Sequence, residues 1–281
     1  CYVNGSYEEK TSAVISIHDR GFNFSDGVYE VMSYSGNNII NFDKHVKRLS
    51  KSLESLRIQK PLSNYKSLQL ILKKLIKVNK LEEGFLYLQI TRGSSSRNHL
   101  FPKLSKPNIV IFTFTVKLDK KFILSGVKVR LTEDLRWKRC DIKSISLLPN
   151  VLEKQNAFEE GMYESWQTRN NLITEGSTSN AFIVNRNGFI QTHPANNFIL
   201  GGVTRDTLIE IAKKKKIKVI ERAFSSSDLF SSKEAFLTST TAQILPVVTI
   251  NEKTIGNGKP GQMTQVLIRM YNELVKCQIH E

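Results

Sequence analysis

Two side chains suited to amine chemistry stand in distinctive local sequences of the second half of the chain. Lys143 follows residues 139–142, which are Arg-Cys-Asp-Ile, and Glu175 opens residues 175–180, which are Glu-Gly-Ser-Thr-Ser-Asn. A lysine amine can form a Schiff base with an aldehyde, and a carboxylate can keep a pyridine nitrogen protonated. Lys143 and Glu175 together therefore indicate a site for a pyridine cofactor that carries an aldehyde.

The neighbours of Lys143 favour this chemistry over that of an ordinary solvated lysine. Trp137 and Cys140 precede it, and Ile145 and Leu147 follow it. An apolar setting disfavours the charged form of an amine, and the neutral amine is the form that attacks an aldehyde or takes up a proton. We considered Cys140 as a nucleophile and interpret it instead as a small buried residue beside the site.

Two turns in the C-terminal half could bind a phosphate group. Gly201 and Gly202 precede Val203 and Thr204 at the start of an expected helix. The exposed backbone N–H groups and the dipole at a helix N-terminus favour an anion. Residues 238–241 form a second, hydroxyl-rich turn after an expected strand. Either turn alone is a common feature, and we consider them as phosphate sites because Lys143 and Glu175 indicate a cofactor.

The first half of the chain completes a longer pattern. Residues 19–31 are Asp-Arg-Gly-Phe-Asn-Phe-Ser-Asp-Gly-Val-Tyr-Glu-Val, and residues 45–49 are His-Val-Lys-Arg-Leu. With the two stretches above, they resemble the fold-type IV enzymes that depend on pyridoxal 5'-phosphate (PLP), the class IV aminotransferases, and most closely the D-amino acid aminotransferases. The resemblance extends from about Val3 to Tyr271. Ser25 stands where the family usually has glycine, and we expect only a local loop adjustment there.

The resemblance implies a role for each matching residue. Lys143 would form the Schiff base and move the proton at the substrate Cα, Glu175 would pair with the pyridine nitrogen, and Tyr29 would reach the active site. Arg48 would bind the phosphate and Leu200 would pack on the cofactor ring. The remaining implied cofactor contacts are Ser177, Thr178, Val203, Thr204 and Thr240.

The substrate prediction depends on Arg97 and His99, which match an Arg-x-His spacing of D-amino acid aminotransferases. There the pair comes from the neighbouring subunit and, with the tyrosine that Tyr29 matches, traps the substrate α-carboxylate, as cationic donors can. The resemblance thus implies a homodimer with shared active sites. It also implies transamination between D-alanine, or a related D-amino acid, and a 2-oxo acid such as 2-oxoglutarate, which gives pyruvate and D-glutamate.

Three alternatives stay open. Branched-chain L-amino acid aminotransferases and aminodeoxychorismate lyases share counterparts of Lys143, Glu175 and Arg48 with this chain. A non-catalytic, basic nucleic-acid-binding protein is a remote third, because the formal net charge is +15. The basic residues are mostly scattered lysines without interleaved aromatics, so we expect no nucleic-acid partner. A Gly-x-Gly-x-x-Gly match at residues 256–261 contains Pro260, and we interpret it as a turn.

Composition and patterning predict an α+β fold in two domains. We expect a smaller N-terminal α/β domain at residues 1–116, a linker at 117–122 and a larger, mixed α+β PLP-binding domain at 123–281. The three cysteines form no CxxC pair, so we expect neither a disulfide nor a metal site. No apolar run approaches a membrane span and no signal peptide is seen, so a cytoplasmic location without membrane partners is expected.

Hydrophobic periodicity and turn residues predict the individual elements. We expect a hairpin turn at residues 35–38 and a helix that Asp43 caps. Further helices are expected at residues 65–78, 151–160, from 204 and 262–276. Strands are expected at residues 85–92, 108–116, 127–131, 219–223 and 235–239, with a hairpin at 180–192 around Asn187 and Gly188.

Overall fold

The computed structural model describes the chain from Cys1 to His280, except for the side chain of His280. It is a mixed α and β structure with two sheets, as the predicted α+β class requires. The chain divides into two compact units. In the part of the chain that the structure describes, none of the helices has the length and apolar character needed to cross a membrane.

The first unit comprises Cys1–Val116, the short segment Ile142–Ser146 and the end of the last helix from Cys277. The second comprises Lys117–Asp141 and Leu147–Lys276. The segment that carries Lys143 is thus part of the first unit, although it lies among residues that the sequence analysis assigned to the C-terminal domain.

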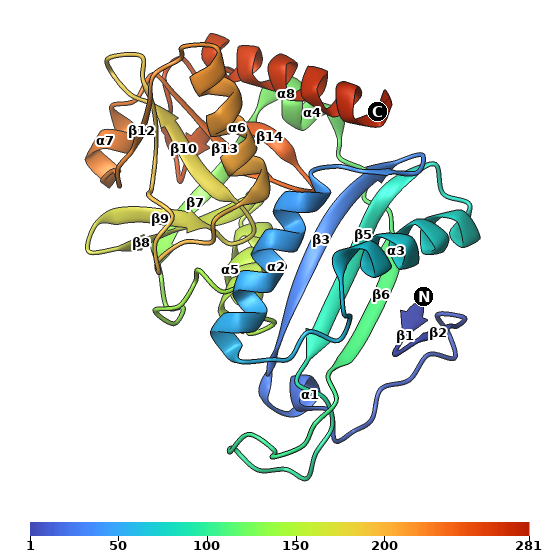
Figure 1. Cartoon of the computed structure of the whole chain (residues 1–281). Coiled ribbons are helices and arrows are strands. Elements are labelled where there is room, and N and C mark those ends of the chain that lie inside the picture. The colour runs from blue at the N-terminus through green and yellow to red at the C-terminus, as the bar shows by residue number, and fades with distance from the viewer. Residues whose placement is uncertain (281) are drawn as a thin grey trace. The chain divides into compact units, whose positions relative to one another are not determined.

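The first unit is built on a six-stranded antiparallel sheet in the order β2-β1-β6-β5-β3-β4. Its strands are β1 (Tyr2–Val3), β2 (Ser6–Tyr7), β3 (Gly27–Ser35), β4 (Asn38–Ile39), β5 (Glu83–Thr91) and β6 (Asn108–Phe114). Side chains along β3 alternate between buried and half-buried, which is the period-two pattern of a strand with one face on a core. Helices α2 (Phe42–Leu56) and α3 (Tyr65–Asn79) cover one face of this sheet (Figure 1) and bury Leu49, Leu53, Leu68 and Leu72 against it.

Two local features of this unit differ from the expectations. The N-cap position of helix α2 is Asn41, at φ 55° and without a side-chain capping hydrogen bond, whereas Asp43 lies in the first helical turn. An acidic side chain in that turn suits the helix dipole. An unexpected short helix, α1 (Arg20–Phe24), precedes β3. The Asp19 side chain accepts a hydrogen bond from the amide of Phe22 and caps it, and Ser25 ends it at φ 54°. Glycine adopts that left-handed conformation more readily than serine, which fits the glycine that the resemblance leads us to expect at this position.

The second unit contains a nine-stranded mixed sheet in the order β12-β11-β10-β13-β14-β7-β8-β9, with β15 paired to β14. Strand β7 runs parallel to β8 and β14, and β11 runs parallel to β12. The strands are β7 (Val127–Glu133), β8 (Glu164–Arg169), β9 (Leu172–Gly176), β10 (Asn180–Val184), β11 (Ile190–Thr192), β12 (Val219–Glu221), β13 (Glu234–Ser239), β14 (Gln243–Ile250) and β15 (Lys253–Thr254). The predicted hairpin at residues 180–192 is confirmed as β10 and β11, with Gly188 at φ 79°.

Helices pack on both sides of this sheet. Helices α6 (Val203–Lys214) and α8 (Gln262–His280) share one core with β10 and β13, in which Phe182 and Phe236 stack 4.9 Å apart. The other helices are α4 (Lys120–Ser125), α5 (Leu148–Glu159) and α7 (Ser226–Phe230). Helix α4 begins inside the segment expected to be a linker, because Asp119 caps it. Residues 256–261 form a turn before α8, which agrees with our interpretation of the glycine motif.

Candidate active site

The backbone of Lys143 is held against the start of β3 in the first unit. The amide of Tyr29 donates to the Lys143 carbonyl at 3.0 Å, and the amide of Ile145 donates to the Gly27 carbonyl at 3.1 Å. The Lys143 amide donates to Ser52 Oγ on α2 at 3.2 Å. A Cβ at Gly27 would lie 2.8 Å from a backbone oxygen of β5, so glycine permits this close approach of three segments.

These contacts bring together Lys143 and Tyr29, two of the residues that the sequence analysis assigned to the site. The Lys143 side chain is half-buried, and its Nζ lies 4.0 Å from the centroid of the Tyr29 ring. The ring itself stacks on Tyr87, with centroids 5.7 Å apart, and Tyr87 stacks on Phe112. Burial, followed by the proximity of Tyr29, raises the pKa of Tyr87 to about 12. The amine is therefore placed on a fixed aromatic surface.

A buried carboxylate, Glu30, organises the residues next to this pair. It is fully buried and accepts two hydrogen bonds from Arg48, Nε to Oε1 at 2.8 Å and Nη2 to Oε2 at 2.7 Å. His45 Nδ1 lies 2.8 Å from Oε2. Burial opposes ionisation of Glu30, but Arg48 and His45 outweigh it and lower its pKa to about 2. Burial lowers the pKa of His45, so we assign the proton of the neutral ring to Nδ1, which faces the carboxylate.

Arg48, predicted to bind phosphate, is thus attached to Glu30 by its Nε and Nη2 edge. A second bidentate acceptor cannot use the same edge. A phosphate group near Arg48 would therefore meet a guanidinium that Glu30 already orients.

Arg97 and His99 lie together on the long connection between β5 and β6. The Arg97 guanidinium carbon is 5.1 Å from the centroid of the Phe24 ring, and the His99 ring is 5.2 Å from the same centroid. Both side chains are exposed. Two cationic or potentially cationic donors on one aromatic platform are suited to binding a carboxylate from solution.

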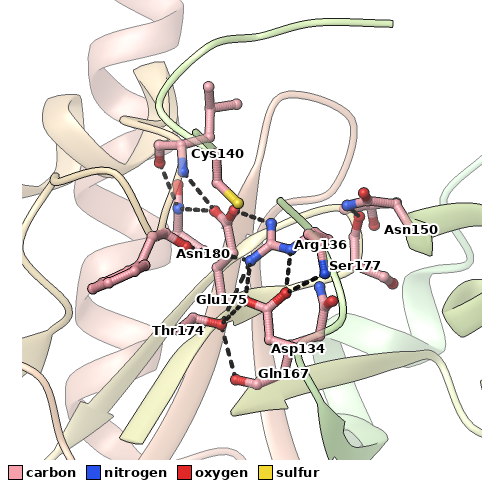
Figure 2. Close-up of polar contacts among 12 residues, drawn as sticks. Asp134, Arg136, Cys140, Asn150, Gln167, Thr174, Glu175, Ser177 and Asn180 are labelled. Carbon is pink, nitrogen blue, oxygen red and sulfur yellow. Dashed lines mark hydrogen bonds and ion pairs between the residues drawn. The ribbon is translucent and has the colours of Figure 1, made fainter. Parts of the chain in front are cut away.

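In the second unit, Glu175 is the centre of a buried polar network on β9 (Figure 2). Arg136 Nη1 donates to its Oε1, while Asn180 Nδ2 and the Leu200 amide donate to Oε2 at 2.9 and 3.0 Å. Glu175 is only 4% exposed. The network brings two predicted cofactor residues, Glu175 and Leu200, into direct contact.

The cation of this network is shared with a second acid. Arg136 donates to Asp134 through Nε at 2.9 Å and Nη2 at 2.8 Å, and Asp134 also pairs with Arg169. Thr174 Oγ1 donates to the same carboxylate at 3.0 Å (Figure 2). Asp134 therefore takes the forked edge of Arg136 and leaves Glu175 a single N–H from it.

Glu175 is harder to ionise than an ordinary carboxyl group, and Arg136, which is shared with Asp134, offsets this only in part. Burial raises the pKa of Glu175 to about 7, although Arg136 and the Leu200 amide act in the opposite direction. A carboxyl group in this state responds strongly to a new neighbour, because a cation placed beside it stabilises the carboxylate.

The remaining predicted cofactor residues surround the ends of β9, β13 and α6. Ser177 is buried and its Oγ has no hydrogen-bond partner in the described part of the chain, and the same holds for Thr238 Oγ1 on β13. Thr178 donates its amide and hydroxyl to Glu164 at 3.2 and 2.9 Å. Thr240 lies in the turn after β13.

The N-terminus of α6 has the features of an anion site. Its N-cap, Gly202, provides no side-chain hydrogen bond to the first turn, which begins with the buried residues Val203 and Thr204. First-turn amides have no intrahelical acceptor. A Cβ at Gly202 would lie 2.0 Å from Asn180 Oδ1, so only glycine fits between the helix and the Glu175 network.

Cys140 is buried beside this network, and its Sγ contacts the Trp137 carbonyl at 3.2 Å. Burial, offset only in part by Arg136, raises the pKa of its thiol to about 11. A thiol in that state is a poor nucleophile, which agrees with the interpretation of Cys140 as a small buried residue.

Several residues of these networks escaped the sequence analysis, among them Glu30, Asp134, Arg136 and Asn180. A general signal existed for some of them, because a glutamate expected inside a buried strand requires a cation nearby. Asp134 and Arg136 precede Lys143 by only a few positions, yet nothing in their local pattern separates them from surface charges.

The arginine of the Glu175 network provides a direct test. Replacing Arg136 with methionine removes the guanidinium bonded to Glu175, so the pKa of Glu175 should rise above 7 and the carboxyl should be protonated at neutral pH. The protonated carboxyl band in the infrared spectrum of the cofactor-free protein, identified by its loss in Glu175→Gln, would report the change. Arg139→Met is the matched control, since Arg139 pairs with Asp141. If the Glu175 carboxyl titrated with the same midpoint in Arg136→Met and Arg139→Met, Arg136 could not be the cation that lowers its pKa.

The same shift fixes the sign of a pH effect on stability. The pKa of Glu175 is raised from 4.5 to about 7 in the folded protein. The folded state therefore binds this proton more tightly than the unfolded state does. The stabilisation that protonated Glu175 adds to the free energy of unfolding is present in full below pH 4.5 and is lost as the pH rises through about 7.

Comparison with known proteins identifies the family of the chain. The family Amino-transferase class IV matches residues 27–250. A D-alanine aminotransferase of Bacillus licheniformis is 37% identical over 262 residues, which are 93% of this chain and 92% of that protein.

Solved structures share the fold. A branched-chain amino acid aminotransferase of Escherichia coli superimposes with a TM-score of 0.89 at 22% identity and covers 97% of this chain and 93% of its own. A branched-chain aminotransferase of the archaeon Thermoproteus uzoniensis, solved with norvaline, has a TM-score of 0.87 at 22% identity, over 98% of this chain and 94% of its own. A third branched-chain aminotransferase, complexed with N-(5'-phosphopyridoxyl)-L-glutamate, also has a TM-score of 0.87, at 21% identity over 99% of this chain and 93% of its own. The family match and the near full-length relative together show that the chain belongs to the class IV aminotransferases.

Proposed function

We propose that this protein is a PLP-dependent D-amino acid aminotransferase that transfers the amino group of D-alanine to a 2-oxo acid such as 2-oxoglutarate. The products would be pyruvate and D-glutamate. The observation that carries the proposal is the buried network around Glu175, which supplies the carboxylate that a pyridine cofactor requires. The choice of a D-amino acid is supported by the relative named D-alanine aminotransferase.

The residues present fit PLP. Ser177 and Thr238 offer buried hydroxyl groups that have no partner in the described residues, so a ligand oxygen could satisfy them. The uncapped first turn of α6, with Val203 and Thr204, suits a phosphate group, and Thr240 adds a nearby hydroxyl. Glu175 provides an acceptor for a protonated ring nitrogen, and Leu200, whose amide binds Glu175, would pack on the ring.

When bound, PLP supplies an aldehyde for the substrate amine and a ring that accepts the electrons released at Cα. Lys143 is the residue that we assign to hold the cofactor and to take the proton from the substrate Cα. Its backbone is fixed by three hydrogen-bonded segments, and its Nζ lies on the Tyr29 ring. Such a placement gives the amine a defined position beside an aromatic ring.

Glu175 would keep the ring nitrogen protonated, and its neighbours determine how well it does so. Asn180 and the Leu200 amide orient the carboxylate, while Arg136 opposes the effect of burial on its ionisation. Because Asp134 shares Arg136, Glu175 would be stabilised as a carboxylate by a second cation such as a protonated ring nitrogen. Arg48, oriented by Glu30, would contribute positive charge to binding of the phosphate.

We assign recognition of the substrate α-carboxylate to Arg97, His99 and Tyr29. Arg97 and His99 lie on one exposed loop and share the Phe24 ring, which is consistent with service to a second subunit. We therefore propose a cytoplasmic homodimer with shared active sites. We also keep residues 117–122 as the proposed boundary between an N-terminal domain and a C-terminal PLP-binding domain.

A paired donor assay tests the proposal. With PLP and 2-oxoglutarate supplied, the protein should transaminate D-alanine far faster than L-leucine, and Lys143→Ala should abolish the reaction because the group that takes the Cα proton is removed. Pyruvate formation and 4-methyl-2-oxopentanoate formation give the two rates. A preference for L-leucine would favour a branched-chain aminotransferase, whose solved structures share this fold.

Truncation of the carboxylate clamp should weaken substrate binding selectively. Loss of one charged hydrogen bond costs roughly 1.5–3 kcal/mol, or about 10- to 150-fold in affinity. Arg97→Ala should therefore raise the KM for D-alanine and for 2-oxoglutarate by about that factor, with the absorbance of bound PLP unchanged. An unaltered KM would remove Arg97 from the clamp.

Mixing of variant subunits tests whether the loop with Arg97 and His99 acts in the active site of the other subunit. If Arg97 acts across a dimer, Arg97→Ala and Lys143→Ala subunits should regain activity on exchange, because both lesions would fall in one site of each mixed dimer. Failure to regain activity after verified exchange would contradict a shared site.

A further inference from the structure

The connection from β5 to β6, residues 92–107, carries Arg97 and His99 and is anchored firmly at its base. Asp19 accepts hydrogen bonds from Thr91 Oγ1 at 2.6 Å and Asn108 Nδ2 at 2.7 Å, so it joins the two strand ends. The Ser95 amide donates to the His18 carbonyl at 3.1 Å. These contacts fix the strand ends and the first residues of the loop, but none of them reaches its tip.

A buried arginine, Arg20, contacts the backbone of the tip, while the neighbouring Phe101 ring lies 3.6 Å from the guanidinium carbon of Arg92. Arg20 is 3% exposed. Its Nη1 donates to the carbonyl of Asn98 at 2.6 Å and more weakly to that of Leu100 at 3.3 Å, and its Nη2 lies 3.4 Å from the carbonyl of His99. A single side chain thus contacts the backbone of three successive residues in a segment whose own side chains are exposed. Figure 1 shows this loop beside α1, the helix that begins with Arg20.

The guanidinium is itself fixed from the other side. Arg20 Nε donates to Asp26 Oδ2 at 2.8 Å, and Asp26 also accepts two hydrogen bonds from Arg92, at 2.8 and 2.9 Å. Arg92 continues to the carbonyls of Leu56 and Arg57 at the end of α2. Burial opposes ionisation of Asp26, but the two arginines lower its pKa. One carboxylate therefore ties the support of the loop tip to the helical layer of the unit.

Side chains as well as backbone rest on α1. The Phe24 ring lies 4.8 Å from the Arg20 guanidinium carbon, 5.1 Å from that of Arg97 and 5.2 Å from the His99 ring. Arg20 and Phe24 thus hold both parts of the segment that carries the candidate clamp. Lysine could not replace the arginine in this arrangement, since a single ammonium cannot span Asp26 and the three carbonyls as a planar fork does.

We propose that Arg20 is a positioning residue for recognition of the substrate carboxylate, which fixes the backbone of residues 98–100 so that Arg97 and His99 stand in place before substrate binds. The inference rests on the proposed function for the role of Arg97 and His99. The geometric part, that Arg20 orders the loop tip, stands on the contacts alone. Preorganisation of this kind acts on binding, because a loosened loop has to be ordered again by the substrate.

The experiment compares Arg20→Gln, Arg20→Lys and the wild-type protein, with Leu68→Ala as the matched control. Leu68 is buried on α3, so its truncation destabilises the same unit without touching the loop. Hydrogen exchange in the cofactor-free protein is followed over residues 92–101. This stretch includes the amides of Ser95 and Leu100, bonded to His18 and Asn98. KM and kcat for D-alanine are then measured with PLP.

We expect faster exchange over residues 92–101 in Arg20→Gln but not in Leu68→Ala. The KM for D-alanine should rise on the order of tenfold with little change in kcat, less than the roughly 10²-fold that a 1 Å misplacement of a reacting group can cause. Arg20→Lys should show an exchange rate and a KM between those of the wild-type protein and Arg20→Gln, since it keeps the charge beside Asp26. If Arg20→Gln does not fold, the exchange rate and KM of Arg20→Lys test the proposal instead.

Exchange that matches the wild-type protein, or that accelerates equally in Leu68→Ala, would overturn the role of Arg20 in ordering the tip. Faster exchange with an unchanged KM would overturn its role in carboxylate recognition. Because exchange needs no substrate, a protein inactive towards D-alanine would contradict the proposed function and still leave the ordering of the loop measurable.

Discussion

A carboxylate removed from water has to be matched by cations and hydrogen-bond donors, and this constraint shapes the candidate site in each unit. In the first unit, Glu30 on β3 determines how Arg48 and His45 of α2 are placed. In the second, Glu175 on β9 determines how Arg136, Asn180 and the Leu200 amide are placed. Removal of either acid would leave buried donors without acceptors, so the surrounding segments depend on both.

The two acids use arginine differently, and the difference suits different tasks. Glu30 receives two N–H groups of Arg48, and its pKa falls to about 2. Glu175 receives one N–H of Arg136, because Asp134 holds the Nε and Nη2 edge. Burial raises the pKa of Glu175 to about 7, and Arg136 opposes this rise only in part. Glu30 is thus a permanent anion that fixes an arginine. Glu175 is a carboxyl group whose charge is completed by a cationic partner, as pairing with a pyridinium requires.

The sequence predicted the elements with strong local signals and missed those that depend on tertiary contacts. The helices over residues 42–56 and 65–79 and the hairpin around Gly188 follow from periodicity and turn residues. Helix α1 has only five residues and exists because Asp19 caps it and Ser25 accepts a left-handed conformation. Glu30 meets partners 15 and 18 positions away, and that contact arises only when α2 packs on β3.

The candidate site divides in the same way. Lys143, Glu175 and the start of α6 were identified because their local motifs resemble a known family, whereas Asp134 and Arg136 carry no such motif. The exact use of Arg48 was also beyond sequence reasoning, since its fork is directed at Glu30 rather than left for a phosphate. The contacts of Gly27 with β5 and of Gly202 with Asn180, which a Cβ would block, are seen only in the structure.

The central claim is that the chain presents one lysine, Lys143, to PLP while Glu175 provides the partner of its ring nitrogen. Incubation with PLP, reduction with borohydride and peptide mapping test this directly. The account predicts that the cofactor becomes covalently fixed to the peptide containing Lys143 and to no other, despite the many other lysines of the chain. Labelling of a different lysine, or of none, would contradict it.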